Sequence, residues 1–502
     1  MKVDLKGAYI LRSAVILCVT LLCYLPSLLH VPRSDQIAYF ADVANKKDLY
    51  SLTIGSFDLN RASQFNRGDE FLFRPLVFFF LGAEKYFFGY HFIWWQAVGI
   101  LLHILTLGIL LKLLLNIRQS RVAFVLVGYF ATSSLCIEMV TWQHIHSFLI
   151  LLAAILIVLD QVYSYIHKGD QKFWRLVVIS CCLLTASLVW EIGIVFSSLI
   201  FIYFCMHASR DDRQWLGRTF MVFPVWIYLL LNALNWTCHQ HSGIAHGSNL
   251  SLNGMTNVVM NGFIGQLYWL MFGLFPDQVS FDIFSRTFLF QRDTIGALSV
   301  FSVVFVILSG YVLMKGGLPR ILLFKKWQFT DLLFWMVFSY VAVLSLGRAT
   351  LLGWKALTIS AYYPHIFWAL VLVFVYSCIN FVLPIHPLVK WVMCGSLSVI
   401  IALNICTVLS TNVVRADAVA ESRKLIAAIE EMKKAHAKNG RFSFYISEYF
   451  PGNHSLKWLS NSDYPGKRYS FIEALYLDSF DPVNPVVPER EIYAYLNKKQ
   501  GS

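Results

Sequence analysis

Residues 116–146 read N-I-R-Q-S-R-V-A-F-V-L-V-G-Y-F-A-T-S-S-L-C-I-E-M-V-T-W-Q-H-I-H. A basic connection with Arg118 and Arg121 precedes the apolar run in this stretch, and Glu138, Trp142 and His146 follow it. The alternation continues along the chain, because short connections rich in Lys and Arg take turns with connections that carry Asp, Glu, His and Trp. Such a pattern predicts a membrane protein with its basic loops on one side and its candidate chemistry on the other.

The composition also indicates a membrane protein. Hydrophobic residues make up 57% of the 502 residues and charged residues only 14%, whereas a soluble domain is about 25% charged. About eleven apolar stretches are long enough to cross a bilayer. The first is expected to be a retained span, because it is too long for a cleavable signal peptide and no A-x-A-like site follows it. The stretches lie near residues 8–30, 92–115, 121–138, 144–164, 173–189, 192–208, 219–236, 296–314, 329–347, 362–383 and 391–410.

The basic residues predict the orientation of the chain. If each apolar stretch crosses once, every basic cluster falls on the same side, and the positive-inside rule makes that side cytoplasmic. The N-terminus is then cytoplasmic, and the chain from about residue 412 onward lies outside. The net charge of +12 is mostly this topology signal, and no basic stripe interleaved with aromatic residues indicates nucleic-acid binding. The clusters are Lys2, Lys6 and Arg12; Arg118 and Arg121; Lys168, Lys172 and Arg175; Arg210, Arg213 and Arg218; and Lys315, Arg320, Lys325 and Lys326.

The sequence therefore predicts an all-α polytopic membrane domain over residues 1–411 and a small extracytoplasmic α/β region over residues 412–502. The first outer loop covers residues 31–91, and a long outer loop covers residues 237–295. The segment Phe73–Gly89 is apolar but contains charged residues, and a crossing there would invert every later basic loop. We therefore expect it to form an amphipathic helix at the outer interface. In the C-terminal region, residues 415–438 predict a charged helix and Arg441–Phe450 predicts a strand.

The outer connections carry the candidate functional residues. Asp35 follows the first span directly, and Glu138 and Glu191 stand at the hydrocarbon edge of later spans. A carboxylate costs ~2.5–3.5 kcal/mol near the membrane centre and less at the interface. Neither glutamate has a cation close by in the sequence, so we expect both to be functional. For Asp35 a structural alternative stays open, because an aspartate near a helix end is often a cap or a solvated loop residue.

The sequence does not favour a metal site. His144 and His146 lie two residues apart, which places them on different faces of a helix. All of the ten cysteines except Cys238 fall inside predicted spans, and neither a C-x-x-C motif nor a Cys/His metal-ligand spacing appears. We therefore expect no cofactor, and a divalent metal stays open as the minority alternative.

Three stretches resemble one known family. The run Glu138–Leu149, E-M-V-T-W-Q-H-I-H-S-F-L, resembles the E-x-V-x-W-x-x-x-R-x-x-L pattern of GT-C membrane glycosyltransferases. Phe73–Leu76, followed by F-G-Y-H at 88–91 and L-L-H at 101–103, resembles their F-R-P-L … F-G … L-L-H passage. Leu188–Ile194, L-V-W-E-I-G-I, resembles their L-x-K-E-x-G-I corner. Over residues 20–210 the chain is thus similar to protein O-mannosyltransferases, to transmembrane-and-TPR O-mannosyltransferases and to their bacterial relatives.

The chain also departs from that pattern. Trp190 stands where the family has Lys, and His146 stands where it has Arg. The late S-R-Y-like element appears as S-A-Y-Y at residues 360–363, and no TPR array follows the last span. These departures leave the donor, the acceptor and retained activity open.

The resemblance implies an inverting sugar transfer from a polyprenyl-phosphate donor to an acceptor on the outer face. In this scheme Asp35 is the catalytic base that accepts the acceptor's proton. Arg348 is expected to bind the departing lipid phosphate, with Arg74 and Lys355 as secondary candidates. The scheme requires no metal. The residues expected to line the cleft are Glu138, His144, His146 and Glu191.

Two non-catalytic functions stay open beside the enzyme. One is a transporter or flippase for lipid-linked glycans, which would carry polar residues through the centres of its spans, where this chain has mostly Leu, Val, Ile and Phe. The other is a degenerate GT-C scaffold that serves as an assembly subunit. The expected partners are a polyprenyl-phosphate sugar, a protein, glycan or lipid acceptor, and the bilayer. A bacterial inner membrane is favoured over the endoplasmic reticulum, because no eukaryotic accessory domain or retention signal is evident.

Overall fold

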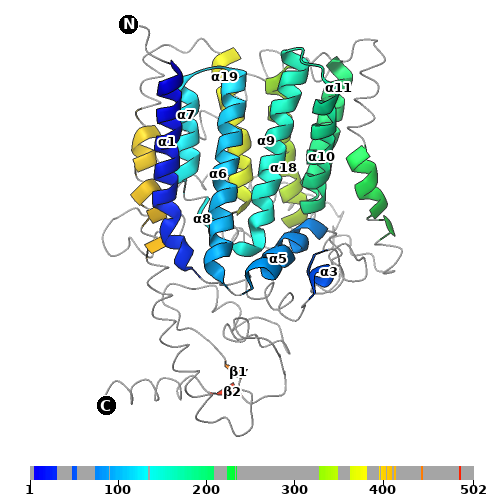
Figure 1. Ribbon diagram of the computed structural model, residues 1–502. Coiled ribbons are helices and arrows are strands. Elements are labelled where there is room, and N and C mark those ends of the chain that lie inside the picture. Colours follow the sequence, from blue (N-terminus) through cyan, green and yellow to red (C-terminus); the bar gives the residue numbers. More distant parts are fainter. Residues whose placement is uncertain are drawn as a thin grey trace, which may run out of the picture.

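A computed structural model describes the protein over residues 5–30, 48–53, 74–89, 91–133, 136–207, 223–231, 233–234, 327–348 and 362–381. It also describes helical positions at 395, 397–402, 404–406, 408–409 and 412–413, and strand positions at 443–444 and 486–487. Nearly all of the described chain is helical (Figure 1). The predicted all-α character of the membrane domain is therefore confirmed over these ranges.

The labelled elements follow one another as a series of helices that run back and forth (Figure 1). They are α1 (Leu5–Tyr24), η1 (Leu25–Leu29), α3 (Leu49–Leu52), α5 (Pro75–Phe88), α6 (Phe92–Ile117), α7 (Arg121–Thr132), α8 (Cys136–Thr141), η4 (Gln143–Ile145), α9 (His146–His167), α10 (Phe173–Val189), α11 (Ile192–His207), α18 (Phe329–Arg348), α19 (Tyr362–Phe381), β1 (Ser443–Phe444) and β2 (Val486–Val487).

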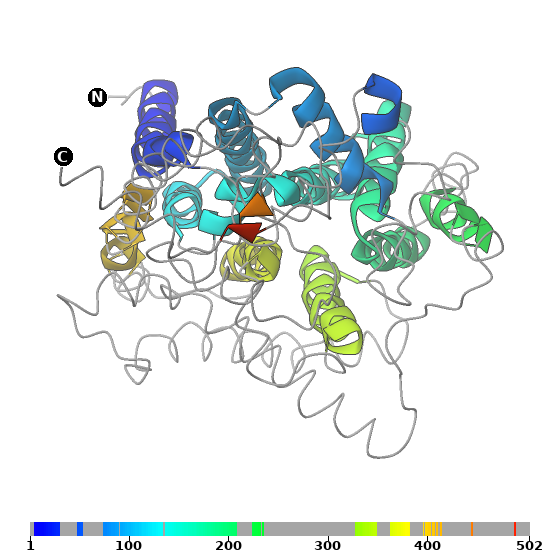
Figure 2. The same ribbon diagram turned by 90° about the horizontal axis from the view of Figure 1, so that it is seen from below.

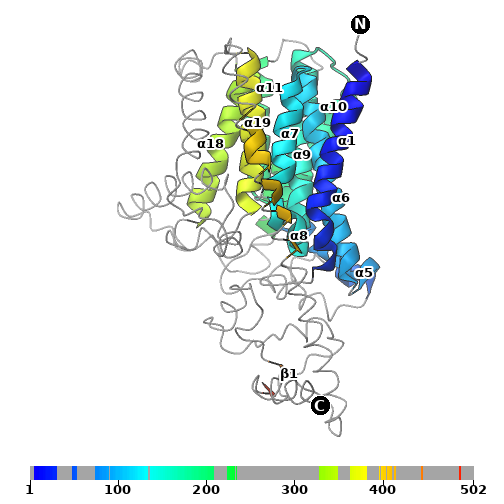
Figure 3. The ribbon, with the colours of Figure 1, turned by 90° about the vertical axis from the view of Figure 1, so that its left-hand side faces the viewer.

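The long helices form one bundle around α9. In the 18-residue apolar windows, 78% of α9 is buried, compared with 22% of the first helix, so α9 is central and α1 is peripheral. Figure 3 shows α1 and α18 at opposite edges of the bundle, with α6, α7 and α9 between them. A central helix that is apolar on every side needs this surrounding layer, because it has no polar face to present to a solvent.

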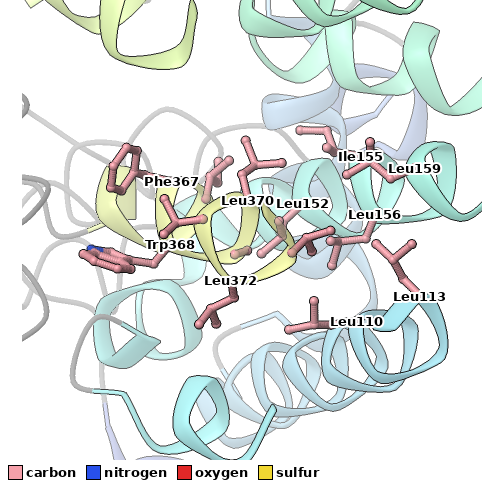
Figure 4. Close-up of a cluster of buried hydrophobic side chains, with 14 of the residues drawn as sticks. Leu110, Leu113, Leu152, Ile155, Leu156, Leu159, Phe367, Trp368, Leu370 and Leu372 are labelled. Carbon is pink, nitrogen blue, oxygen red and sulfur yellow. The ribbon is translucent and has the colours of Figure 1, made fainter. Parts of the chain in front are cut away.

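The centre of the bundle is packed by hydrophobic side chains from three helices that are separated in the sequence. Figure 4 shows α19 meeting α6 and α9 through these side chains, all of which are buried. The residues labelled there are Leu110 and Leu113 of α6, Leu152, Ile155, Leu156 and Leu159 of α9, and Phe367, Trp368, Leu370 and Leu372 of α19.

Length and composition identify three candidate membrane spans among the described helices, namely Tyr9–Leu29, Phe92–Ile117 and His146–His167. Six further helices are apolar but shorter, and they coincide with predicted spans: Arg121–Thr132, Phe173–Val189, Ile192–His207, Phe329–Leu344, His365–Asn380 and Leu397–Cys406. The predicted stretch 296–314 lies outside the described residues. The total of eleven spans therefore stays a prediction.

One predicted span ends earlier than the hydropathy indicated. The stretch 121–138 is helical only to Thr132, and Glu138 belongs to the separate short helix α8. The Thr132 hydroxyl donates a hydrogen bond to the Gly128 carbonyl at 3.0 Å, and Ser133 then leaves the helix with extended backbone angles (φ −61°, ψ 133°). The hydropathy of the run does not register this local change of backbone direction at Ser133, so the prediction placed the end of the span too far along the chain.

Helix α5 lies across the lower end of the bundle rather than through it (Figures 1 and 2). Pro75 occupies its first turn, and Gly89 ends it with a positive φ of 54°, which an L residue adopts only at a cost. The short helix α3 packs directly against it, since a Cβ added at Gly82 would lie 1.5 Å from the carbonyl oxygen of Leu52. The first outer connection thus covers one end of the bundle.

The opposite end of the bundle is basic. Lys112 of α6 lies 3.1 Å from Asp160 of α9, and Lys168 donates a hydrogen bond to Asn116. Arg175 of α10 holds the pKa of Asp170 below its usual range, mainly by its hydrogen bond to that carboxylate. A cavity of about 580 Å³ opens among these side chains. Cations of α6, α9 and α10 therefore gather at the end away from α5, as the alternating connections predict.

In the C-terminal region the structure describes one parallel pair. Ser443 pairs with Val486 and Phe444 with Val487. Figures 1 and 3 show β1 and β2 beyond the α5 end of the bundle. Two residues per strand do not establish a domain, so the α/β region over 412–502 stays a prediction, and its expected helix over 415–438 lies outside the described residues.

The contact between α3 and α5 predicts a stability loss on Gly82→Ala. The added methyl group would collide with the Leu52 backbone, and overpacking of this kind costs about 1–3 kcal/mol. We expect a lower melting temperature of the detergent-purified protein, followed by intrinsic fluorescence. Gly108→Ala is the matched control, because a Cβ there meets nothing within 4 Å. An unchanged melting temperature in Gly82→Ala would contradict the close packing of α3 on α5.

Candidate functional site

An ion pair between Arg74 and Glu191 joins the start of α5 to the corner between α10 and α11. Arg74 Nε donates to Glu191 Oε1 at 2.9 Å, and Nη2 donates to Oε2 at 2.8 Å. This two-pronged geometry is the strongest form of an Arg–carboxylate contact. The side chains are only 24% and 26% exposed. Glu191 thus has a cation after all, supplied from 117 positions away in the sequence.

A second pair connects the middle of α5 to the start of α9. His146 Nδ1 lies 2.8 Å from Glu84 Oε1, and both side chains are buried. Burial raises the pKa of the Glu84 carboxyl, while the charge and hydrogen bond of His146 act in the opposite direction. Gly99 of α6 makes room for this imidazole, because a Cβ at that position would lie 2.5 Å from His146 Nε2.

Several polar atoms around these pairs are buried and have no hydrogen-bond partner among the described residues. They are Glu84 Oε2, Gln96 Oε1, Ser147 Oγ, and both the oxygen and the nitrogen of the Gln143 amide. Gln96 uses its other amide atom to donate to the Thr141 carbonyl at 3.0 Å. Buried polar groups without partners are uncommon and mark places where a polar ligand can bind.

Glu138 and Trp190 complete the described part of this end of the bundle. Glu138 is buried on α8, eight residues before His146 in the sequence. Trp190 packs with its ring centroid 5.9 Å from Phe148 and 5.5 Å from Tyr340. It is therefore an apolar wall beside Glu191, at the position where the GT-C pattern has Lys.

Two of the eight predicted site residues, Arg74 and Glu191, contact each other, and the structure describes the side chains of four of the eight. These are Arg74, Glu191, His146 and Glu138. The backbones of His144 and Arg348 belong to η4 and α18, and their side chains lie outside the description. Asp35, the predicted base, and Lys355 also lie outside the described residues. Their roles stay predictions.

Sequence reasoning missed Glu84, Gln96 and Gln143. Glu84 was visible as a charge that interrupts an apolar segment, and that signal pointed to topology rather than to a site. Gln143 lies inside the W-Q-H-I-H run, where the two neighbouring histidines are the more obvious candidates for a site. Gln96 has no signal of its own, since a lone glutamine near a helix start is common.

One group of side chains deeper in the bundle has a metal-binding composition. His103, Cys136 and His365 each offer one ligand atom, and these atoms lie within 4.8 Å of one another. They come from α6, α8 and α19. None of them is among the predicted site residues.

The two-pronged ion pair between Arg74 and Glu191, called the fork below, predicts that the stability losses of single substitutions are not additive. Arg74→Gln and Glu191→Gln should each lower the melting temperature, and the double variant should be no worse than the poorer single variant. The half-buried fork is expected to contribute about 1–2 kcal/mol of coupling, between the values for exposed and buried pairs. Lys172→Gln is the control, because its side chain is 66% exposed. Strictly additive shifts would rule out the pair.

Comparison with known proteins gives matches only among solved structures. No family model and no curated protein matches the sequence. ArnT from Cupriavidus metallidurans bound to undecaprenyl phosphate is 11% identical with a TM-score of 0.46, over 96% of this chain and 90% of that chain. The apo Archaeoglobus fulgidus oligosaccharyltransferase is 10% identical with a TM-score of 0.41, over 89% of this chain and 63% of that one. AglB from the same organism, in complex with an inhibitory peptide and a dolichol-phosphate, is 11% identical with a TM-score of 0.35, over 80% and 56%. Likenesses at this level do not assign the chain to a family.

Proposed function

We propose that this protein is a membrane glycosyltransferase of the GT-C type, which moves a sugar from a polyprenyl-phosphate donor to an acceptor on the face of the bundle covered by α5. One observation carries the proposal. The ion pair Arg74–Glu191 and the hydrogen-bonded pair Glu84–His146 connect the three stretches that resemble the GT-C pattern, F-R-P-L, E-M-V-T-W-Q-H-I-H and W-E-I-G-I, at one end of the bundle. Residues far apart in the sequence thus form a single polar region beside an apolar bundle.

This arrangement suits a donor that is half lipid and half sugar phosphate. The apolar helices offer a surface for a polyprenyl chain, and the polar end offers donors and acceptors for sugar hydroxyls. The unpartnered amide of Gln143 and Oε2 of Glu84 are groups of the kind that recognise hydroxyls. A partly dry site also strengthens every charged contact within it.

In the proposed mechanism, Asp35 removes the proton from an acceptor hydroxyl as the oxygen attacks the anomeric carbon. The bond from that carbon to the phosphate oxygen breaks on the opposite face, so the configuration inverts. Arg348 and Lys355 stabilise the phosphate that leaves. Arg74 already engages Glu191 through Nε and Nη2, so its role is to position the corner between α10 and α11 rather than to bind phosphate first.

The transporter and the scaffold remain the competing functions. Both predict no sugar transfer, whereas the enzyme predicts transfer that depends on one carboxylate. The burial of Glu84, Gln96 and Gln143 at one end of the bundle favours a site with a fixed face over a polar path through the bundle.

Sugar transfer in membranes is the test of this function. Membranes that express the wild type receive a panel of radiolabelled polyprenyl-phosphate sugars together with native acceptor-containing membranes. We expect transfer from one donor, and we expect Asp35→Asn to reduce it by about 10²-fold or more, as for loss of a general base. Asp170→Asn is the matched control, because this carboxylate lies at the basic end of the bundle and is ion-paired to Arg175.

Each outcome of this assay decides between the functions. Transfer that persists in Asp35→Asn would keep the enzyme and reject Asp35 as its base. Absence of transfer from every donor, at normal expression, would favour the transporter or the scaffold.

A further inference from the structure

Three buried side chains meet in the bundle without a role in the proposed transfer. His103 of α6, Cys136 at the start of α8 and His365 of α19 are all 0% exposed. Their ligand atoms lie within 4.8 Å of one another, and Cys136 Sγ is 3.2 Å from His365 Nδ1. These residues are separated by 33 and 229 positions in the sequence, so only the tertiary structure brings them together.

The surroundings of this cluster are apolar and rigid. The ring of Phe130 stacks on His365 with centroids 4.7 Å apart, and the ring of Tyr24 meets His103 edge-on at 5.4 Å. No Asp or Glu belongs to the cluster among the described residues. Aromatic walls of this kind hold the imidazoles in place and exclude water from them.

Hydrogen bonds within the protein account for only part of the cluster. The Cys136 thiol donates to the Phe130 carbonyl at 3.0 Å, and His103 Nε2 lies 3.4 Å from the Ala131 carbonyl. His103 Nδ1 and His365 Nε2 are buried without a hydrogen-bond partner among the described residues. Leaving such a group unsatisfied is unfavourable, so two of them in one cluster indicate that a further partner can bind there.

We propose that His103, Cys136 and His365 bind one thiophilic transition-metal ion. One sulfur and two imidazole nitrogens form a donor set that suits Cu⁺ and Zn²⁺ and excludes the hard ions Mg²⁺ and Ca²⁺. Around a metal, ligand atoms at bond lengths of about 2.0–2.3 Å lie roughly 3.3–3.8 Å apart. Cys136 Sγ and His365 Nδ1 already lie this close, and the remaining ligand atoms, which lie within 4.8 Å of one another, need to approach by at most about 1 Å.

Charge balance decides between the two ions. Binding replaces the thiol proton by the metal, and the proton leaves to solvent. A Cu⁺ ion with one thiolate is neutral, whereas Zn²⁺ with the same ligands leaves one positive charge in an apolar interior, which is costly. Three ligands also satisfy Cu⁺, while structural Zn²⁺ sites take four. The cluster therefore favours Cu⁺.

A metal at this position would hold α8 against α6 and α19. Cys136 and Glu138 lie on the same short helix, and this helix has only six residues. A helix of that length is not stable by itself. The ion would thus fix the element that carries Glu138, independently of whether the protein transfers a sugar.

Metal binding by the full-length protein in detergent tests this site. The protein is stripped with a chelator under reducing conditions and then loaded with Cu⁺ or Zn²⁺ alone. We expect one Cu⁺ per chain, an X-ray absorption spectrum with one sulfur and two nitrogen ligands, and a higher melting temperature after loading. Cys136→Ser should abolish both the stoichiometric binding and the shift in melting temperature. Cys378→Ser, which alters a buried cysteine of α19 outside the cluster, should retain them.

The outcomes separate the alternatives. Zn²⁺ bound in place of Cu⁺, with the same dependence on Cys136, would keep the site and reject the charge argument. Wild type that binds neither ion above a blank, or Cys136→Ser that retains full binding, would overturn the site. If Cys136→Ser does not fold, the stoichiometry and the absorption spectrum of the wild type decide by themselves.

Discussion

The fork between Arg74 and Glu191, with the neighbouring pair of Glu84 and His146, determines how the outer connections meet the bundle. A carboxylate at the edge of an apolar bundle must find a cation or a donor. Glu191 meets Arg74 at the start of α5, and Glu84 in the middle of α5 meets His146 of α9. Because α5 is held at two points, it lies across the bundle end rather than through it.

The same constraint explains the distribution of polar groups along the bundle. Lys112, Asn116 and Lys168 collect around Asp160 at one end, and the Glu–His and Arg–Glu pairs collect at the other. Between them the interior is filled by Leu, Ile and Phe from α6, α9 and α19. The exception is the cluster of His103, Cys136 and His365, which contains two buried nitrogens without a hydrogen-bond partner among the described residues. A metal ion bound at this cluster would therefore give the buried imidazoles a partner that the described protein groups do not supply.

The residues that carry the GT-C resemblance and those that form the polar end of the bundle overlap only in part. The resemblance rests on short patterns around Arg74, Glu138 and Glu191. The geometry adds Glu84, Gln96 and Gln143, which no pattern includes. The substitution of Trp190 for a lysine also acquires a physical meaning, since its ring packs on Phe148 and Tyr340 and makes the corner an apolar wall. Arg74 supplies the positive charge at this corner.

The sequence by itself determined the helical class, the positions of most apolar stretches, the non-crossing character of α5 and the segregation of basic connections, because these depend on local composition and on the repeat of side chains along a helix. It also identified Arg74, Glu191 and His146, which take part in the two polar pairs at the α5 end. It could not identify the break between α7 and α8, where the backbone becomes extended at Ser133, or the partner of Glu191. Pairs separated by 62, 117 or 229 positions leave no periodic trace, so only the tertiary structure decided which carboxylate meets which cation and which histidines meet a cysteine.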